Sequence, residues 1–131
     1  MSIERDYLMR QIKQLFDVLS KILRHRKKGE LEEAEDQVKY FYKVLKWEKD
    51  IRKMSIEELL DYVQDNKKLS NEQIELLGFV LKEQGELSQV EDERIDFFRK
   101  AYFLLEAVER ESLSFSMDRQ MKLGELKAYL N

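Results

Sequence analysis

Apolar residues recur at helical spacing along most of the chain. In the first segment they fall on one face over four turns: Leu8, Ile12, Leu15, Phe16, Leu19, Ile22 and Leu23. Positions three and four residues apart lie on the same side of an α-helix, so this pattern predicts a helix over residues 3–28. The same positions also fit a heptad seam, which leaves pairing with a second copy of the chain open.

Later segments repeat this periodicity. They predict helices over residues 30–46, 55–64, 71–89, 93–110 and 117–130. Ser55 and Ser70 each begin a capping box, a pattern typical of a helix start. The end of the second helix stays open between Lys46 and Met54. The pattern as a whole predicts an all-α fold, a compact bundle of about six antiparallel helices in a single domain over residues 1–131.

The segments 71–89 and 93–110 are expected to form the centre of this fold. The later one carries apolar side chains around about half of its circumference, so it should contact at least two neighbouring helices. Gly78 and Gly85 lie on the apolar face of the earlier one, where each costs about 1 kcal/mol relative to alanine. Close approach of the backbone of the 93–110 helix would compensate for that cost, so we predict an antiparallel pair with glycine at the contact.

Composition narrows the class of protein. The 131 residues include no cysteine and no proline, so a disulfide framework and a thiolate metal site are excluded. The chain has no apolar run of about 18 residues, and its charged start does not resemble a signal peptide, so we expect a cytoplasmic protein without a membrane span. A formal net charge of −3 disfavours nucleic acid as the main partner.

Candidate chemistry is sparse. The only histidine, His25, lies in the basic run Arg24–Lys28, which Gly29 and then acidic residues follow. This order is what the helix dipole favours at the end of one helix and the start of the next. RNA binding through Arg24–Lys28 is a weaker alternative. Without a Glu-x-x-His pair, a glycine-rich phosphate loop or a nucleophile near a suitable base, we expect no catalytic, cofactor-binding or metal-binding residue and no enzyme.

Two helical hairpins of the chain resemble the tetratricopeptide repeat. The matching residues are Gly29 with Ala34 in the first hairpin, and Leu77, Gly78, Leu81, Gly85, Phe98 and Ala101 in the second. The closing proline of that repeat is absent, so a single degenerate repeat with extra helices is expected rather than a regular superhelix.

The whole chain also resembles a family of small bacterial proteins known only as a domain of unknown function with tetratricopeptide-like helices. This resemblance rests on the opening segment 6–12, on Gly29 with Ala34, on the serine-capped segment 57–60, and on Ala101 with the aromatic and leucine residues that follow. It implies the fold and a bacterial, cytoplasmic origin, and it implies no activity.

Five polar or aromatic residues are candidates for binding a partner. Phe79 lies among charged residues, away from the apolar face of its helix, and Glu75 and Lys82 lie on the same side. In tetratricopeptide-like folds this side faces the binding groove, whereas the alternative is that the first or third helix covers Phe79. Arg10 and Gln11 lie beside the apolar face of the first helix, where they either bridge to a neighbouring helix or line a groove.

These candidates favour a non-catalytic protein–protein interaction module, adaptor or regulatory, whose protein partner is unknown. The alternative is a structural homodimer that associates through the first helix or an exposed Trp47 region. An apolar face of the first helix wider than the fold can cover would favour the homodimer.

Overall fold

The computed structural model describes residues 3–131. Within that range it contains six α-helices and no strand, so the prediction of an all-α fold is confirmed. The helices are α1 (Ile3–Lys27), α2 (Leu31–Val44), α3 (Ile56–Asp61), α4 (Asn71–Leu87), α5 (Glu91–Glu111) and α6 (Met117–Leu130). A 3₁₀ turn, η1 (Ile51–Lys53), precedes α3, and a π-helical turn, η2 (Tyr62–Asn66), continues it.

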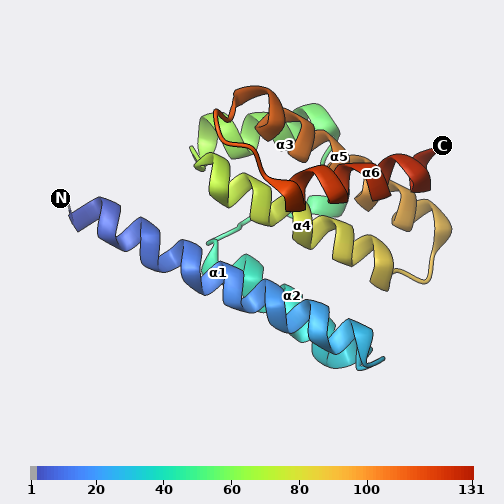
Figure 1. The fold of residues 1–131 in the computed structure, drawn as a ribbon. Coiled ribbons are helices and arrows are strands. Elements are labelled where there is room, and N and C mark those ends of the chain that lie inside the picture. Colours follow the sequence, from blue (N-terminus) through green and yellow to red (C-terminus); the bar gives the residue numbers. More distant parts are fainter. Residues whose placement is uncertain (1–2) are drawn as a thin grey trace. The chain divides into compact units, whose positions relative to one another are not determined.

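The chain divides into two compact units (Figure 1). The N-terminal unit is Met1–Lys49, described from residue 3 onward, and contains α1 and α2. The C-terminal unit is Asp50–Asn131 and contains η1 through α6. The single domain expected from the sequence stays a prediction.

The N-terminal unit is a helical hairpin. Of the apolar face expected for its first helix, Leu15, Leu19 and Ile22 are buried, and Val18 is buried beside them. Phe16, which the pattern also placed on that face, is exposed. The hairpin turn follows the basic end of α1, where Gly29 has a φ of 76°. This left-handed conformation favours glycine because glycine has no Cβ to clash with the backbone.

The centre of the C-terminal unit is the pair α4 and α5, as the sequence predicts. A Cβ on Gly78 would overlap the side chain of Leu105, and one on Gly85 would overlap the ring of Phe98. The glycines therefore compensate for their cost in helix propensity by admitting two large α5 side chains. The α5 backbone comes less close than these side chains. Its nearest atom, the carbonyl oxygen of Ala101, would lie 3.6 Å from a Cβ added at Gly78.

Local signals placed the helix boundaries well. Ser55 and Ser70 both form reciprocal capping boxes, with Glu58 and Gln73 respectively. The second helix ends at Val44, two residues earlier than predicted, and the open stretch that follows holds the turn η1. Trp47 is half-buried beside Tyr42, with ring centroids 5.8 Å apart, rather than the exposed residue that the sequence suggested.

Three cations of the C-terminal unit are buried and joined to carboxylates. Lys82, Lys100 and Arg119 are each at most 4% exposed. Lys82 pairs with Glu125 at 2.8 Å, and Lys100 donates to Asp96 at 2.6 Å and to the Ile51 carbonyl. These contacts connect η1 to α5, and α4 to α6, so the cations hold neighbouring elements of the unit together.

Arg119 is the most heavily bonded of the three cations. Its guanidinium donates to Glu109 at 2.6 Å, to Glu75 at 2.7 Å and to the Ser114 carbonyl at 2.8 Å. Burial alone would lower the pKa of Arg119, but the hydrogen bonds to Glu109 and Glu75 outweigh it and leave that pKa raised. Arg119 therefore stays charged and fastens the α5–α6 connector to α4.

Candidate functional site

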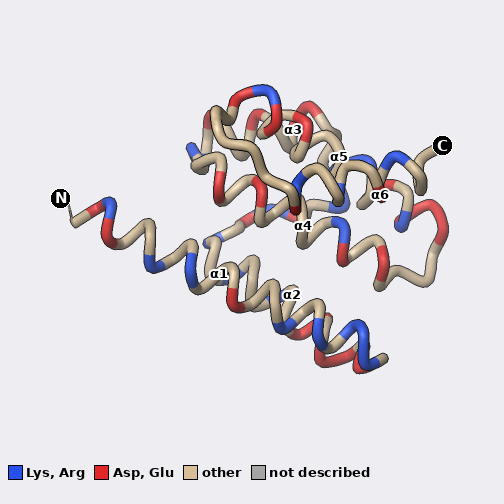
Figure 2. The backbone as a smooth tube through the Cα atoms, in the orientation of Figure 1, with Lys and Arg blue, Asp and Glu red and all other residues tan. Residues whose placement is uncertain are grey.

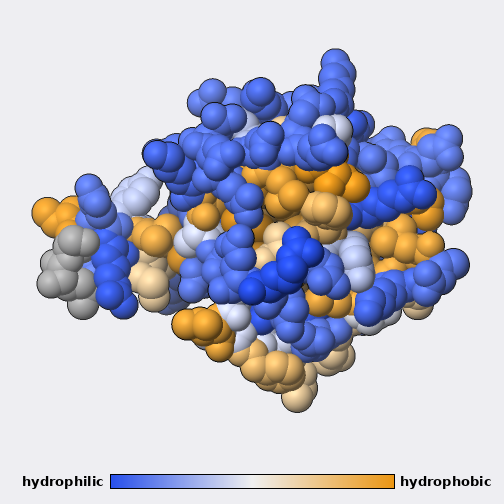
Figure 3. Space-filling model, turned by 90° about the horizontal axis from the view of Figure 1, so that it is seen from above, coloured by the Kyte–Doolittle hydropathy of each residue, from blue (hydrophilic) through white to orange (hydrophobic). Residues whose placement is uncertain are grey.

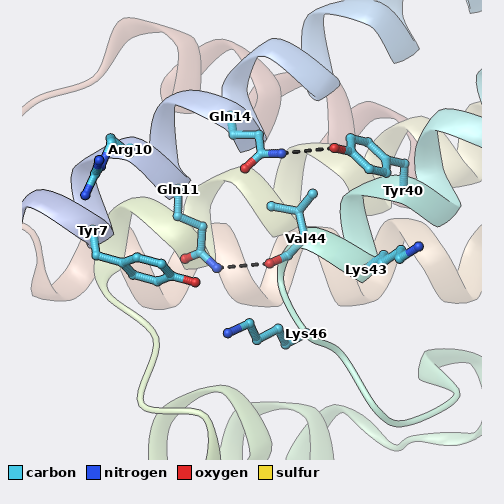
Figure 4. A pocket seen from close by; sticks show the side chains of 8 residues that line it. All are labelled: Tyr7, Arg10, Gln11, Gln14, Tyr40, Lys43, Val44 and Lys46. Atoms are coloured by element: carbon cyan, nitrogen blue, oxygen red, sulfur yellow. Dashed lines mark hydrogen bonds between the residues drawn. The ribbon is translucent and has the colours of Figure 1, made fainter. Parts of the chain in front are cut away.

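The candidate site is a groove of about 620 Å³ in the N-terminal unit, hereafter the α1–α2 groove (Figure 4). Eight residues line it: Tyr7, Arg10, Gln11, Gln14, Tyr40, Lys43, Val44 and Lys46. The four from α1 follow the spacing i, i+3, i+4 and i+7, which is a single stripe along a helix. The others come from the last turn of α2 and the residues just after it.

Two hydrogen bonds between the helices fix the walls of the groove. Gln11 Nε2 donates to the Val44 carbonyl at 3.0 Å, and Gln14 Nε2 donates to the Tyr40 hydroxyl, also at 3.0 Å. Figure 4 shows both bonds crossing from α1 to α2. The groove is therefore built on rigid elements, which lowers the entropy cost of binding a ligand there.

Lys46, just after the end of α2, lines the groove and has an unusual backbone conformation. The Trp47 amide donates to the Tyr42 carbonyl and the Lys46 amide donates to the Lys43 carbonyl, which is the bonding pattern of a Schellman motif. In that motif the residue in the left-handed conformation is usually glycine, yet here it is Lys46, with a φ of 59°. The Lys46 ammonium lies 5.7 Å from the centre of the Tyr7 ring.

The charge of the groove has one sign. Its lining includes three cations and no aspartate or glutamate. Among residues 3–131, neither Arg10 nor Lys43 is within ion-pair distance of a carboxylate. Figure 4 places Arg10 on the α1 side of the groove and Lys43 on the α2 side. The two side chains lie at opposite sides of the view and their charged ends point away from each other, so an extended ligand with several negative charges would suit them better than a single small anion.

The structure brings together two of the five predicted binding residues. Gln11 both makes the bridge to the neighbouring helix and lines the groove, so its two alternatives coexist, whereas Arg10 is placed only by its position in the groove lining. The sequence did not point to the two tyrosines or to Lys46. The spacing of Tyr7 from Arg10 and Gln11 was the available signal for the first of these.

The other three predicted residues lie in the C-terminal unit and are engaged within it or buried. Phe79 is only 9% exposed, so of its two alternatives the structure supports burial. Glu75 accepts a hydrogen bond from Arg119, and Lys82 pairs with Glu125. These residues are therefore poorly placed to form an open groove.

The basic end of α1 has acidic neighbours. His25 Nδ1 lies 2.9 Å from Glu30 Oε1, and Figure 2 shows red acidic positions at the start of α2 beside the blue end of α1. The hydrogen bond with His25 is the main cause that lowers the pKa of Glu30, and nearby cations add to it. These acids weaken the positive field that RNA binding through Arg24–Lys28 would need.

Comparisons with family models, curated proteins and solved structures find no match to this chain. The resemblance to tetratricopeptide-like proteins therefore stays a prediction. Within residues 3–131, no helix is long and apolar enough to cross a membrane, and no cluster of three or more His, Cys, Asp or Glu side chains is arranged to hold a metal ion.

Proposed function

We propose that this protein is a non-catalytic protein–protein interaction module and that the α1–α2 groove receives a segment of its partner. The observation that carries the proposal is the groove itself, a recess with walls from two helices that hydrogen bonds hold in place. Its volume lies in the range typical of binding sites.

The tyrosines of the groove support a protein partner. Tyr7 is 52% exposed and Tyr40 is 42% exposed, although both rings are large apolar surfaces. Tyrosine is enriched at protein interfaces because it offers contact area and a polar hydroxyl at a low cost in side-chain entropy. An adaptor that binds through these two rings gains affinity from burying them.

The lining residues favour binding over catalysis. They include no serine, cysteine, histidine or carboxylate. Nucleophilic catalysis requires a nucleophile activated by a nearby base, which is in turn oriented by a third group. The groove does not offer that arrangement.

The test is a capture experiment with the tagged full chain in lysate of its source cells. The double variant Tyr7→Ala/Tyr40→Ala removes the two rings, and Phe115→Ala removes an exposed ring that does not line the groove. A partner that is retained by wild type and by Phe115→Ala, but lost by the double variant with its helical circular dichroism unchanged, is the expected result. Equal capture by all three proteins would contradict the proposal.

Self-association is a second candidate, and one observation favours it. Met9 and Phe16 are both more than half exposed and lie two turns apart, on the same side of α1. The face of the molecule drawn in Figure 3, on which no residue is labelled, also has hydrophobic side chains, in orange, among the hydrophilic ones. Sedimentation velocity of wild type beside Met9→Ser/Phe16→Ser tests this candidate. A dimer that the double variant converts to monomer supports self-association, and a wild-type monomer at high concentration rejects it.

A further inference from the structure

We propose that the α1–α2 groove binds an acidic segment of the partner protein, a short stretch of aspartate and glutamate whose carboxylates contact Arg10, Lys43 and Lys46. This inference rests on the proposed function for the location of the site, and it adds the chemistry of the occupant.

The backbone of Lys46 is the first support. The turns after α1 and after α2 have the same hydrogen bonds: the Gly29 and Glu30 amides donate to Arg26 and His25, just as the Lys46 and Trp47 amides donate to Lys43 and Tyr42. The left-handed residue of the first turn is glycine, with a φ of 76°, and that of the second is lysine, with a φ of 59°. The two motifs therefore differ in the side chain at one equivalent position.

A left-handed lysine is unfavourable because its Cβ approaches the following carbonyl oxygen, a penalty that glycine avoids. A penalised conformation is often found where the side chain has a functional use. The side chain of Lys46 lines the groove and its ammonium lies over the Tyr7 ring. We therefore infer that this lysine is present for the charge that it brings to the groove.

Charge complementarity is the second support. Arg10, Lys43 and Lys46 reach the groove from α1, from the last turn of α2 and from the residue after its C-cap. Each lost contact with a carboxylate on a ligand would raise the dissociation constant several-fold, because hydrogen bonds between charged groups are stronger than neutral ones.

The C-terminus of a helix normally repels an anion, because its free carbonyls carry partial negative charge. At α2 that effect is reduced. The Val44 carbonyl accepts from Gln11, and the carbonyls of Tyr42 and Lys43 accept from the amides of the Schellman motif. These hydrogen bonds therefore offset part of the negative charge at the end of α2 that would face a ligand.

A short acidic peptide fits better than a long polyanion. Asp6 and Asp36 precede Arg10 and Tyr40 by one helical turn on α1 and α2, so acidic side chains lie one turn from these two lining residues of the groove. A nucleic acid that extended past the groove would meet these carboxylates. The tyrosine rings and Val44 instead offer apolar contact to side chains between the acidic residues of a peptide.

The test uses the full chain and a fluorescein-labelled peptide of alternating glutamate and alanine, with fluorescence anisotropy at low salt. Saturable binding that weakens with salt is expected, with no binding of the matching lysine–alanine peptide. Lys46→Gly should weaken binding about five- to tenfold and yet raise the Tm by about 2–4 °C, because it removes both the charge and the backbone strain. A purely structural role for Lys46 would not separate affinity from stability in this way.

Two further variants control the measurement. Lys68 also has a positive φ, 51°, but lies in the C-terminal unit outside the groove, so Lys68→Gly should raise the Tm similarly and leave affinity unchanged. Lys46→Arg keeps the charge and should retain binding within about twofold.

Several outcomes would overturn the inference: no saturable binding of the acidic peptide, unchanged affinity in Lys46→Gly, or tighter binding of polyuridylate than of the acidic peptide. The last would assign the groove to RNA. If the acidic peptide fails to bind but Tyr7→Ala/Tyr40→Ala still loses the captured protein partner, the proposed function stands and only the acidic chemistry is wrong.

Discussion

The two units of this protein use their positive charges in opposite ways. The C-terminal unit has 12 lysine and arginine residues against 18 aspartate and glutamate residues, and three of its cations are buried in contact with carboxylates. The N-terminal unit has 12 such cations against 9 acids, and three of the cations line an open groove that contains no acid. The cations hold elements together in one unit, whereas in the other they line a groove for which we propose an acidic ligand.

This difference matters because charge alone does not mark a binding site. Lys82 was a candidate for partner binding on sequence grounds, yet it is buried beside Glu125. Lys46 carries the same charge but lies at a groove, in a backbone conformation that costs stability. The surroundings of each lysine, rather than the lysine itself, separate the structural role of Lys82 from the binding role that we propose for Lys46.

The largest expected effect concerns the buried phenylalanine of the C-terminal unit. Phe79→Ala should lower the free energy of unfolding by about 3 kcal/mol, because it removes a large side chain and leaves a cavity. Phe16→Ala in the N-terminal unit, where the ring is 55% exposed, should change it by about 0.5 kcal/mol or less. Urea unfolding of both variants gives the comparison, and a fully stable Phe79→Ala would return that residue to the list of surface candidates.

The next effect concerns the arginines. Arg119→Ala leaves the carboxylates of Glu75 and Glu109 without their donor. Because both acids are partly exposed and water can solvate them, we expect the free energy of unfolding to fall by only about 2 kcal/mol. Arg10→Ala should lower the free energy of unfolding by about 0.5 kcal/mol or less. The same variant should weaken binding of the acidic peptide. Similar stability losses in the two variants, again by urea unfolding, would erase the contrast between the units.

Glycine gives a smaller contrast inside the C-terminal unit. Gly85→Ala places a methyl group against the Phe98 ring, so the variant should be about 1 kcal/mol less stable although alanine favours the helix. Gly124→Ala in α6 meets no atom within 4 Å and should be stabilised by about 0.5–1 kcal/mol. Thermal unfolding followed by circular dichroism should therefore show opposite shifts in Tm. If both variants shifted Tm in the same direction, Gly85 and Phe98 would be packed less closely than they are in the structure.

The smallest expected effect is a pH dependence in the N-terminal unit. The pKa of Glu30 is lower in the folded chain than its ordinary value, so its ionised form contributes stability above the ordinary value, and this contribution is lost as the pH falls through the folded value. Glu30→Gln should remove that part of the acid dependence. Urea midpoints of wild type and Glu30→Gln should converge as the medium becomes acidic, and a constant difference would show that the His25 contact is not responsible.

Much of the fold could be predicted from the sequence because its signals are local. Apolar periodicity located the six helices, and serine capping boxes located two of their starts. Gly29 marked the first hairpin turn. Each of these signals depends on residues within one or two helical turns, which is the range over which propensity and capping act.

The candidate site could be predicted only in part. Arg10 and Gln11 stood out because they are polar beside an apolar face, but Val44, whose carbonyl accepts from Gln11, lies 33 positions further along the chain. The left-handed lysine at position 46 could not be foreseen, because the motif usually uses glycine there. The burial of Phe79 was equally out of reach, since a residue among charged neighbours in sequence can still be covered in the folded chain.

The most direct test of the account is an NMR titration of the ¹⁵N-labelled full chain with the glutamate–alanine peptide. We predict saturable shifts in the backbone amides of Tyr7 to Gln14 and Tyr40 to Lys46, and no shift at Glu75, Phe79 or Lys82. Shifts confined to those last three residues, or no saturable shift anywhere in the chain, would contradict the assignment of the binding site to the α1–α2 groove.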